Sequence, residues 1–160
     1  MAERLNRQQL DAWQRLQVVT ERLRRVVGRD LRVDADLSEA EFTVLAHIVE
    51  AGGAARPGEC ARSMGWDSSR VAHQLRRLEA RGLVIRNAGT PGDGRGAVIA
   101  LTESGRVAHR AAVGPHLRAA ANWFADALTS EQMGHLDDAL ISIAAHLDRL
   151  ETGDADGSRE

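Results

Sequence analysis

The chain has 160 residues, 43% of them hydrophobic, which is enough for one compact domain with its own core. Its apolar stretches are interrupted by charged residues or glycine, so we expect no membrane-spanning helix, which needs roughly 20 apolar residues. The first ten residues lack the apolar segment of a signal peptide, and the single cysteine, Cys60, argues against a disulfide framework. These features predict a cytoplasmic protein with a single domain over residues 1–160.

The net charge of −2 hides an uneven distribution of charge along the chain. Residues 67–110 contain eight arginines and four acidic residues, whereas residues 111–160 contain three arginines and nine acidic residues. A basic middle next to an acidic C-terminal part predicts one module that faces an anionic partner on a scaffold that faces elsewhere.

Amphipathic helices are predicted at both ends of the chain. Apolar residues recur at steps of three and four over residues 7–27, and from Met133 to Leu150 the steps are 3-4-3-4-3, which is a heptad seam. The same spacing occurs in ordinary monomer cores. We favour dimerisation through residues 7–27 and 106–150, with a kink or a restart of the helix near Gly114 and Pro115. Residues 151–160 are expected to be a disordered tail.

Between these helices, capping and turn signals predict three short helices followed by a hairpin. Ser38 and Glu41 form a capping box at the start of the first of them. The remaining boundaries are Gly52–Gly53, Pro57, Gly65, Asp67 or Ser68, and Gly82. Two short apolar runs, residues 83–85 and 97–101, are predicted strands joined by the glycine-rich loop 87–96. This order is that of a winged helix-turn-helix, so the predicted fold is mainly α with a small β-hairpin wing.

In a winged helix-turn-helix, the helix that ends at Gly82 is the one expected to enter the DNA major groove. Its apolar side is predicted to consist of Val71, Leu75 and Leu78. On the opposite side we place a polar face that contacts bases and phosphates, formed by Arg70, His73, Gln74, Arg77 and Arg81. The alternative is an ordinary solvated charged face.

Three linked motifs within residues 38–105 resemble the MarR family of bacterial regulators. They are LEARGLV at residues 78–84, DGRG at residues 93–96 and LTESG at residues 101–105. The resemblance implies that Arg95 enters the minor groove and that Asp93 holds the wing or this arginine in place. Ala72 departs from the serine or threonine of many members, so base specificity does not carry over. The predicted DNA-contacting residues are Ser68, Ser69, Arg70, His73, Gln74, Arg77, Asp93 and Arg95.

The resemblance further implies a homodimeric, ligand-responsive repressor that binds a pseudo-palindromic site in double-stranded DNA. Its effector would be a small aromatic or phenolic molecule held in a crevice next to the dimerisation helices. Trp13, Phe42 and His47 are the candidate effector-binding residues, although each also suits ordinary packing. Redox sensing by Cys60 and metal sensing by the histidines are weaker alternatives.

No sequence motif indicates catalysis, because the chain has no phosphate-binding glycine loop after a strand and no nucleophile elbow. We therefore predict no enzyme activity, no catalytic residue, no metal site and no cofactor. The main alternative function is a winged-helix module whose arginines bind an acidic protein partner. The salt dependence of binding to duplex DNA would separate the two functions.

Overall fold

The computed structural model describes residues 4–87 and 97–156 and divides the chain into two compact units, one up to Ala120 and one from Ala121 onward. The first unit contains α1 (Arg7–Ala35), α2 (Glu39–Glu50), β1 (Ala54–Ala55), α3 (Pro57–Met64), α4 (Ser68–Ala80), β2 (Val84–Asn87), β3 (Val98–Leu101) and most of α5 (Glu103–Trp123). The second contains the end of α5, a short 3-10 turn η1 (Ala125–Ala127) and α6 (Ser130–Asp156). No helix in the described part of the chain is both long and apolar enough to span a membrane.

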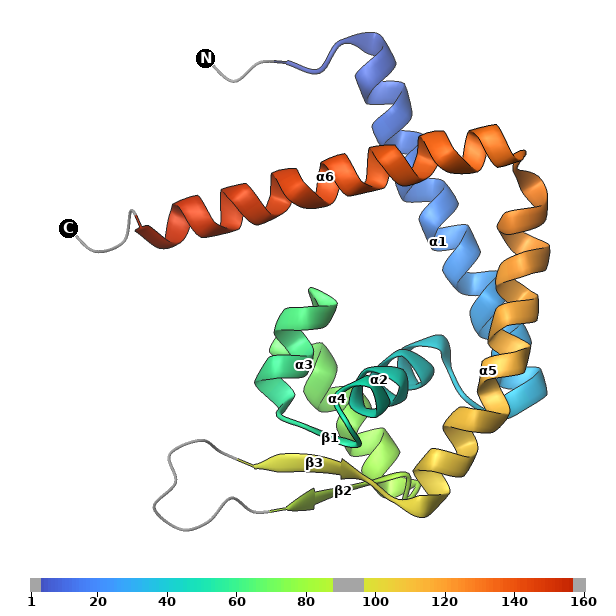
Figure 1. Cartoon of the computed structure of the whole chain (residues 1–160), viewed down its shortest axis with the longest axis vertical. Helices are drawn as coiled ribbons and strands as arrows, with labels where there is room; N and C mark the ends of the chain where they lie inside the picture. The colour runs from blue at the N-terminus through green and yellow to red at the C-terminus, as the bar shows by residue number, and fades with distance from the viewer. Residues whose placement is uncertain (1–3, 88–96, 157–160) are drawn as a thin grey trace. The chain divides into compact units, whose positions relative to one another are not determined.

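Helices α2, α3 and α4 lie next to a three-stranded antiparallel sheet (Figure 1), and this confirms the predicted winged helix-turn-helix. The strand order is β1-β3-β2, with Ala100 of β3 placed between Ala54 and Ile85. The sequence analysis predicted the β2–β3 hairpin but not β1. A strand of two alanines is too short to show the alternation by which strands are recognised.

Local signals account for where the middle helices begin and end. Ser38 and Glu41 form the predicted capping box, in which Ser38 Oγ accepts from the Glu41 amide and Glu41 Oε2 accepts from the Ser38 amide. Gly65 ends α3 with a left-handed backbone at φ 61°, and Gly82 follows α4 at φ 68°. Glycine adopts these angles without the steric cost that a Cβ would impose.

The core of the first unit is contributed by α1, α2, α4 and the sheet. Leu31, Leu45, Ile48 and Leu78 have 0% exposure, and Ile99 of β3 has 1%. A fully buried side chain of this size contributes on the order of 1.5–3 kcal/mol. The winged helix-turn-helix is therefore supported by a closed apolar core that includes the end of α1.

The base of the wing is joined tightly to the start of α5. Thr102 Oγ1 donates to the carbonyl oxygens of Gly82 and Leu83 and accepts from the Gly105 amide. Gly105 is buried, and a Cβ there would collide with the Leu83 carbonyl oxygen. These contacts give the LTESG motif a physical reason: it lets α5 begin directly against the turn before β2.

Three predicted boundaries are wrong. Helix α1 runs past residue 27 to Ala35, because Leu31 and Ala35 extend its packed side. Helix α5 does not restart at Pro115 but continues through it, although proline has no amide for the helix ladder, because the buried side continues from Ala112 to Ala119. Residues 151–156 of the predicted tail are helical and belong to α6, while residues 157–160 lie outside the described part.

Candidate nucleic-acid interface

Helix α4 is the centre of the candidate interface. Its apolar side is buried as predicted, with Val71 and Leu75 at 1% exposure and Leu78 at 0%. The helix packs against both α2 and α3. Because this stripe is fixed in the core, the orientation of every other α4 side chain follows from the helical repeat of 3.6 residues per turn.

The side chains that point away from the buried stripe are Ser69, His73 and Arg76, all exposed, and Ser68 at the start of the helix is exposed as well. Ser68, Ser69 and His73 were predicted as DNA-contacting residues. Arg76 was missed, although its position three residues after His73 on the same side of the helix could have revealed it. This outward surface is polar and basic and lies at the end of α4 that helix-turn-helix proteins direct at base edges.

Of the five residues in the polar face expected opposite the core, His73 points outward, and the other four lie along the margin of the core. Arg70 is half-buried, and its guanidinium carbon is 3.7 Å from the centre of the Trp66 ring, which is a cation–π contact. Gln74 is also half-buried, and its Oε1 is shielded from solvent without a hydrogen-bond partner among the described residues. Arg70 therefore already contacts another residue of the protein before any DNA is bound, and Gln74 is already partly enclosed by the protein.

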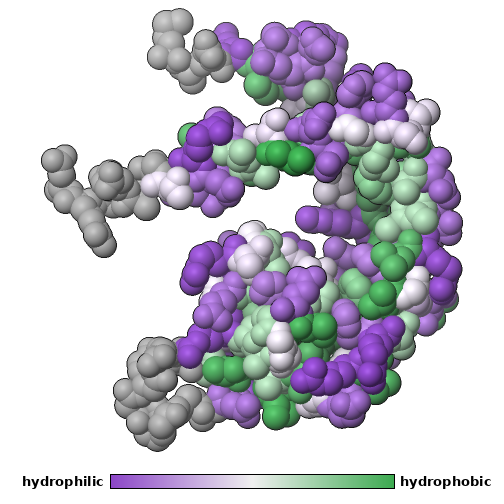
Figure 2. Space-filling view, viewed as in Figure 1, coloured by the Kyte–Doolittle hydropathy of each residue, from purple (hydrophilic) through white to green (hydrophobic). Residues whose placement is uncertain are grey.

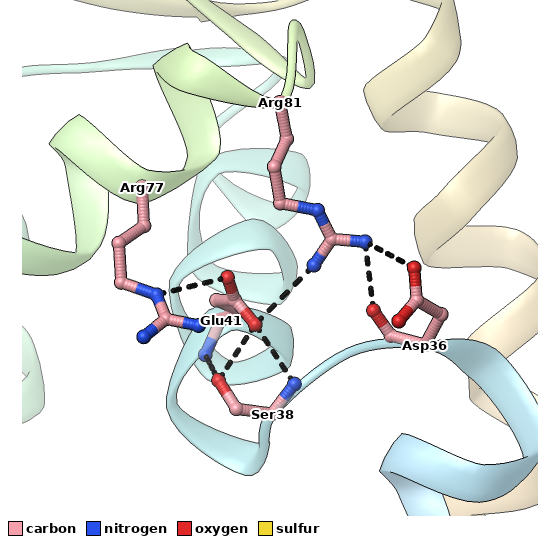
Figure 3. A network of polar contacts seen from close by, with 5 residues as sticks. All are labelled: Asp36, Ser38, Glu41, Arg77 and Arg81. Carbon is pink, nitrogen blue, oxygen red and sulfur yellow. Dashed lines mark hydrogen bonds and ion pairs between the residues drawn. The ribbon is translucent and has the colours of Figure 1, made fainter.

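Arg77 and Arg81 continue this margin and reach the N-terminus of α2 (Figure 3). Arg77 Nε lies 3.4 Å from Glu41 Oε1, and Arg81 NH1 lies 3.4 Å from Glu41 Oε2. Arg81 NH2 also donates to the carbonyl oxygen and the carboxylate of Asp36, at 2.7 and 2.9 Å. Glu41 is thus shared by two arginines of α4, and Arg81 connects the ends of α1, α2 and α4.

Glu41 is a buried carboxylate, with 1% exposure. Burial alone would raise its pKa, but the hydrogen bonds from Ser38 and the charges of Arg77 and Arg81 outweigh burial and lower the pKa below the ordinary value. The group is therefore ionised at neutral pH. Sequence analysis had assigned Glu41 only to the capping box, because no sequence pattern links it to arginines 36 and 40 residues away.

Asp93 and Arg95 lie outside the described residues. At the base of the wing, a hollow of about 360 Å³ is lined by Arg86 of β2, by Arg56 just before α3 and by Arg62 within α3. Arg86 Nε is 3.9 Å from Glu79, and Arg56 Nε is 3.8 Å from Glu59. The sequence analysis did not single out these three arginines, because they come from separate elements.

A second feature of the first unit is a cavity of about 540 Å³ between α2 and α5. Phe42 and His47, two of the three candidate effector-binding residues, line it, and Trp13 does not. Trp13 lies on α1 with 52% exposure. The other residues lining the cavity are Thr43, Ala46, Glu50, Met64, His109, Val113, His116 and Leu117.

Two histidines from α5 lie against Phe42 in this cavity, with the His109 ring stacked on it and the His116 ring tilted. The ring centroids of Phe42 and His109 are 5.4 Å apart, and those of Phe42 and His116 are 4.4 Å apart. Desolvation lowers the pKa of both histidines, only partly offset by the nearby charges of Glu50 and Glu39 respectively. Both rings are therefore mainly neutral at pH 7, and His116 Nδ1 is buried without a partner among the described residues.

His47 and Cys60 have local roles. His47 Nε2 is 2.9 Å from Ser63 Oγ, which links α2 to α3. Cys60 has 0% exposure, and burial raises the pKa of its thiol. A buried thiol that remains protonated is a poor nucleophile, so its environment is that of a core residue.

Large apolar side chains remain exposed on α6 and on the N-terminal part of α1. On α6, Leu140, Ile143, Leu147 and Leu150 have exposures between 47% and 54%. Trp13, Leu16 and Val19 on α1 have exposures between 44% and 52%. Figure 2 shows apolar surface along α6 interspersed with polar surface. In each unit, an amphipathic helix thus exposes the side that the sequence analysis assigned to dimerisation.

Comparison with known proteins shows which family the winged-helix region resembles. The sequence model of the MarR family matches residues 35–96. The chain is also similar to AbsC, a MarR-family transcriptional regulator from Streptomyces coelicolor, with 29% identity and a TM-score of 0.79 over 92% of this chain and 99% of that one. Residues 35–96 are therefore similar in sequence to the MarR family, and the chain shares the fold of a MarR-family regulator. This confirms the resemblance drawn from the three motifs and the winged helix-turn-helix fold.

Two further similar structures were each solved with a bound partner. Sco3205, a MarR-family regulator from Streptomyces coelicolor solved in complex with DNA, has 27% identity and a TM-score of 0.79 over 90% of this chain and 94% of that one. CouR from Rhodococcus jostii RHA1, solved with p-coumaroyl-CoA, has 29% identity and a TM-score of 0.67 over 81% of this chain and 88% of that one. No curated protein matches the chain.

Proposed function

We propose that this protein is a homodimeric transcriptional regulator of the MarR type that binds a specific double-stranded DNA site and acts as a ligand-responsive repressor. One observation carries the proposal: Ser69, His73 and Arg76 point outward from a helix whose opposite side is locked in the core. Such a rigid, polar and basic helix suits the major groove. The DNA complex of the similar Sco3205 supports the same partner.

In the proposed complex, α4 lies in the major groove and the wing loop contacts the adjacent minor groove through Arg95, with Asp93 in a supporting role. Arg56, Arg62 and Arg86 add positive charge beside the wing, where they would contact backbone phosphates. A narrow minor groove concentrates negative potential, so a guanidinium is favoured there without hydrogen bonds to particular bases.

The homodimer is proposed from the exposed apolar residues of α1 and α6. Leu140, Leu147 and Leu150 lie at heptad spacing and are about half exposed, which is unfavourable for a helix in water without a partner. Two-fold symmetry in the protein would be matched by a pseudo-palindromic DNA site with half-sites about one helical turn apart.

Ligand response is proposed from the cavity between α2 and α5. Its volume of about 540 Å³ is suitable for a small aromatic molecule. Phe42 and the neutral His109 and His116 present flat rings against which an aromatic ligand can stack. The structure of the similar CouR with p-coumaroyl-CoA supports an aromatic effector, although Trp13 is not among the residues that line this cavity.

The test is a titration of duplex DNA with wild type, Arg95→Ala, Arg76→Ala and the control Arg149→Ala, whose arginine lies on α6. We expect at least tenfold weaker binding for Arg95→Ala, with a larger loss on A·T-rich flanks, weaker binding for Arg76→Ala, and no change for the control. Wild type should protect roughly 20 base pairs. Addition of p-coumarate or salicylate should weaken binding.

Equal affinity for all four proteins would contradict the proposed interface. Failure of wild type to bind any duplex would favour the alternative in which the arginines bind an acidic protein partner. Unchanged DNA affinity in the presence of both aromatic acids would contradict this choice of effector class while leaving DNA binding intact.

A further inference from the structure

Arg77 is held in an unusual way for a residue on a DNA-binding helix. Its Nε is 3.4 Å from the buried Glu41 carboxylate, yet 49% of its side chain is exposed. The only hydrogen bond that the Arg77 side chain makes within residues 4–87 and 97–156 uses this Nε (Figure 3). One edge of the guanidinium is thus bound to the protein, and its terminal nitrogens remain available to a partner.

Glu41 can hold Arg77 in place because Glu41 is itself fixed. Its Oε2 accepts from Ser38 N at 2.9 Å and from Ser38 Oγ at 2.8 Å, and Arg81 lies 3.4 Å from the same oxygen. Oε1 is thereby left for Arg77. A flexible arginine side chain loses rotamer entropy when it is ordered, so ordering it before binding lowers that cost in the complex.

From this geometry we propose that Glu41 is a positioning residue for DNA binding, which orients Arg77 so that its terminal nitrogens meet a backbone phosphate. The inference rests on the proposed DNA-binding function and extends it to an acidic residue that does not touch DNA. Arginine suits this double role because its planar fork can donate to a carboxylate and a phosphate at the same time, whereas a lysine ammonium is a single point charge.

A positioning role for Glu41 and simple charge repulsion predict opposite effects of Glu41→Gln on the affinity for DNA. Glu41→Gln removes a negative charge close to the DNA-binding helix, and long-range electrostatics alone would strengthen binding. Positioning predicts the reverse: affinity for DNA falls by on the order of tenfold. Glutamine is also a good third residue of a capping box, so α2 keeps its N-terminal hydrogen bonds.

The experiment uses the full chain and a mixed-sequence duplex, because a phosphate contact acts on all sequences alike. Binding is measured at several salt concentrations for wild type, Glu41→Gln, Arg77→Lys and the charge-matched control Glu103→Gln, whose side chain is 77% exposed. We expect both Glu41→Gln and Arg77→Lys to weaken binding and to lower the salt slope by about one unit per subunit. Glu103→Gln should bind as well as wild type or better.

The double variant Glu41→Gln with Arg77→Lys completes the cycle. If Glu41 acts through Arg77, the second substitution adds less than about twofold to the loss caused by the first. Arg77→Lys keeps the charge and the core, so it tests the proposal even where Glu41→Gln proves too unstable to assay. Multiplicative losses, or wild-type affinity in Glu41→Gln or in Arg77→Lys, would overturn the inference. Failure of wild type to bind the duplex would instead refute the proposed function.

Discussion

The winged-helix core and helix α6 use the same apolar residue types but bury them to very different extents. Leu45, Ile48 and Leu75 in the first unit have exposures of 1% or less, whereas Leu140 and Leu147 on α6 remain at 47% and 51%. The first region satisfies its own hydrophobic residues within one chain. The second has a regular heptad seam that stays exposed, and this is why we propose that its partner surface lies on another molecule. Burial in the structure, more than hydrophobicity in the sequence, separates a core from an interface.

The largest expected effect is on the seam of α6. In Leu140→Asp/Leu147→Asp, two charges enter the proposed interface at a cost of several kcal/mol, so the dimer should be lost. Sedimentation equilibrium should then give a mass near 17.4 kDa in place of about twice that value. The matched control is His135→Asp/Ser142→Asp, which adds the same number of aspartates at exposed positions off the seam and should remain dimeric. A dimeric Leu140→Asp/Leu147→Asp variant would show that the seam faces elsewhere.

A smaller effect is expected in the winged-helix core. Leu75→Ala leaves a cavity beneath α4, where Leu75 has 1% exposure, and should lower the free energy of unfolding by about 2–5 kcal/mol in a urea titration. Arg76→Ala, the adjacent but exposed position, should change it by less than about 0.5 kcal/mol. If both variants unfold at the wild-type midpoint, the core is not as tightly packed as the exposures indicate.

The smallest effect concerns pH. Desolvation lowers the pKa of His109 and His116 from 6.5 in the folded state, so the unfolded chain binds more protons as pH falls. Stability from these groups is fully present above pH 6.5 and is lost as pH falls through the folded-state pKa values. The lowered pKa of Glu41 adds a separate loss below pH 4.5.

Melting temperatures measured from pH 8 to pH 5 should therefore decline, and the decline should be shallower in His109→Leu/His116→Leu. His135→Gln, on exposed α6, is the control and should keep the wild-type profile. A profile of equal steepness in all three proteins would assign the pH dependence to other groups.

Much of the fold could be predicted from local signals. The capping box at Ser38 and Glu41, the left-handed Gly65 and the turn at Gly82 act within a few residues, so they could be recognised in the chain alone. The three linked motifs led to the resemblance to the MarR family on the same basis. The extent of α1 could not be predicted in this way, because its last turns are stabilised by burial of Leu31 in the core.

The sequence by itself determined the order of the helices and of the two hairpin strands, the resemblance to the MarR family and the heptad spacing of α6, because each depends on residues close together in the chain. Tertiary structure alone decided how the side chains of α4 are used. Burial of Val71, Leu75 and Leu78 turned His73 and Arg76 outward and left Arg77 beside Glu41, 36 residues earlier. It also brought Phe42 between His109 and His116 of α5. The physical reason is that burial and ion pairing depend on distances between residues in space. The local periodicity of a sequence does not specify those distances.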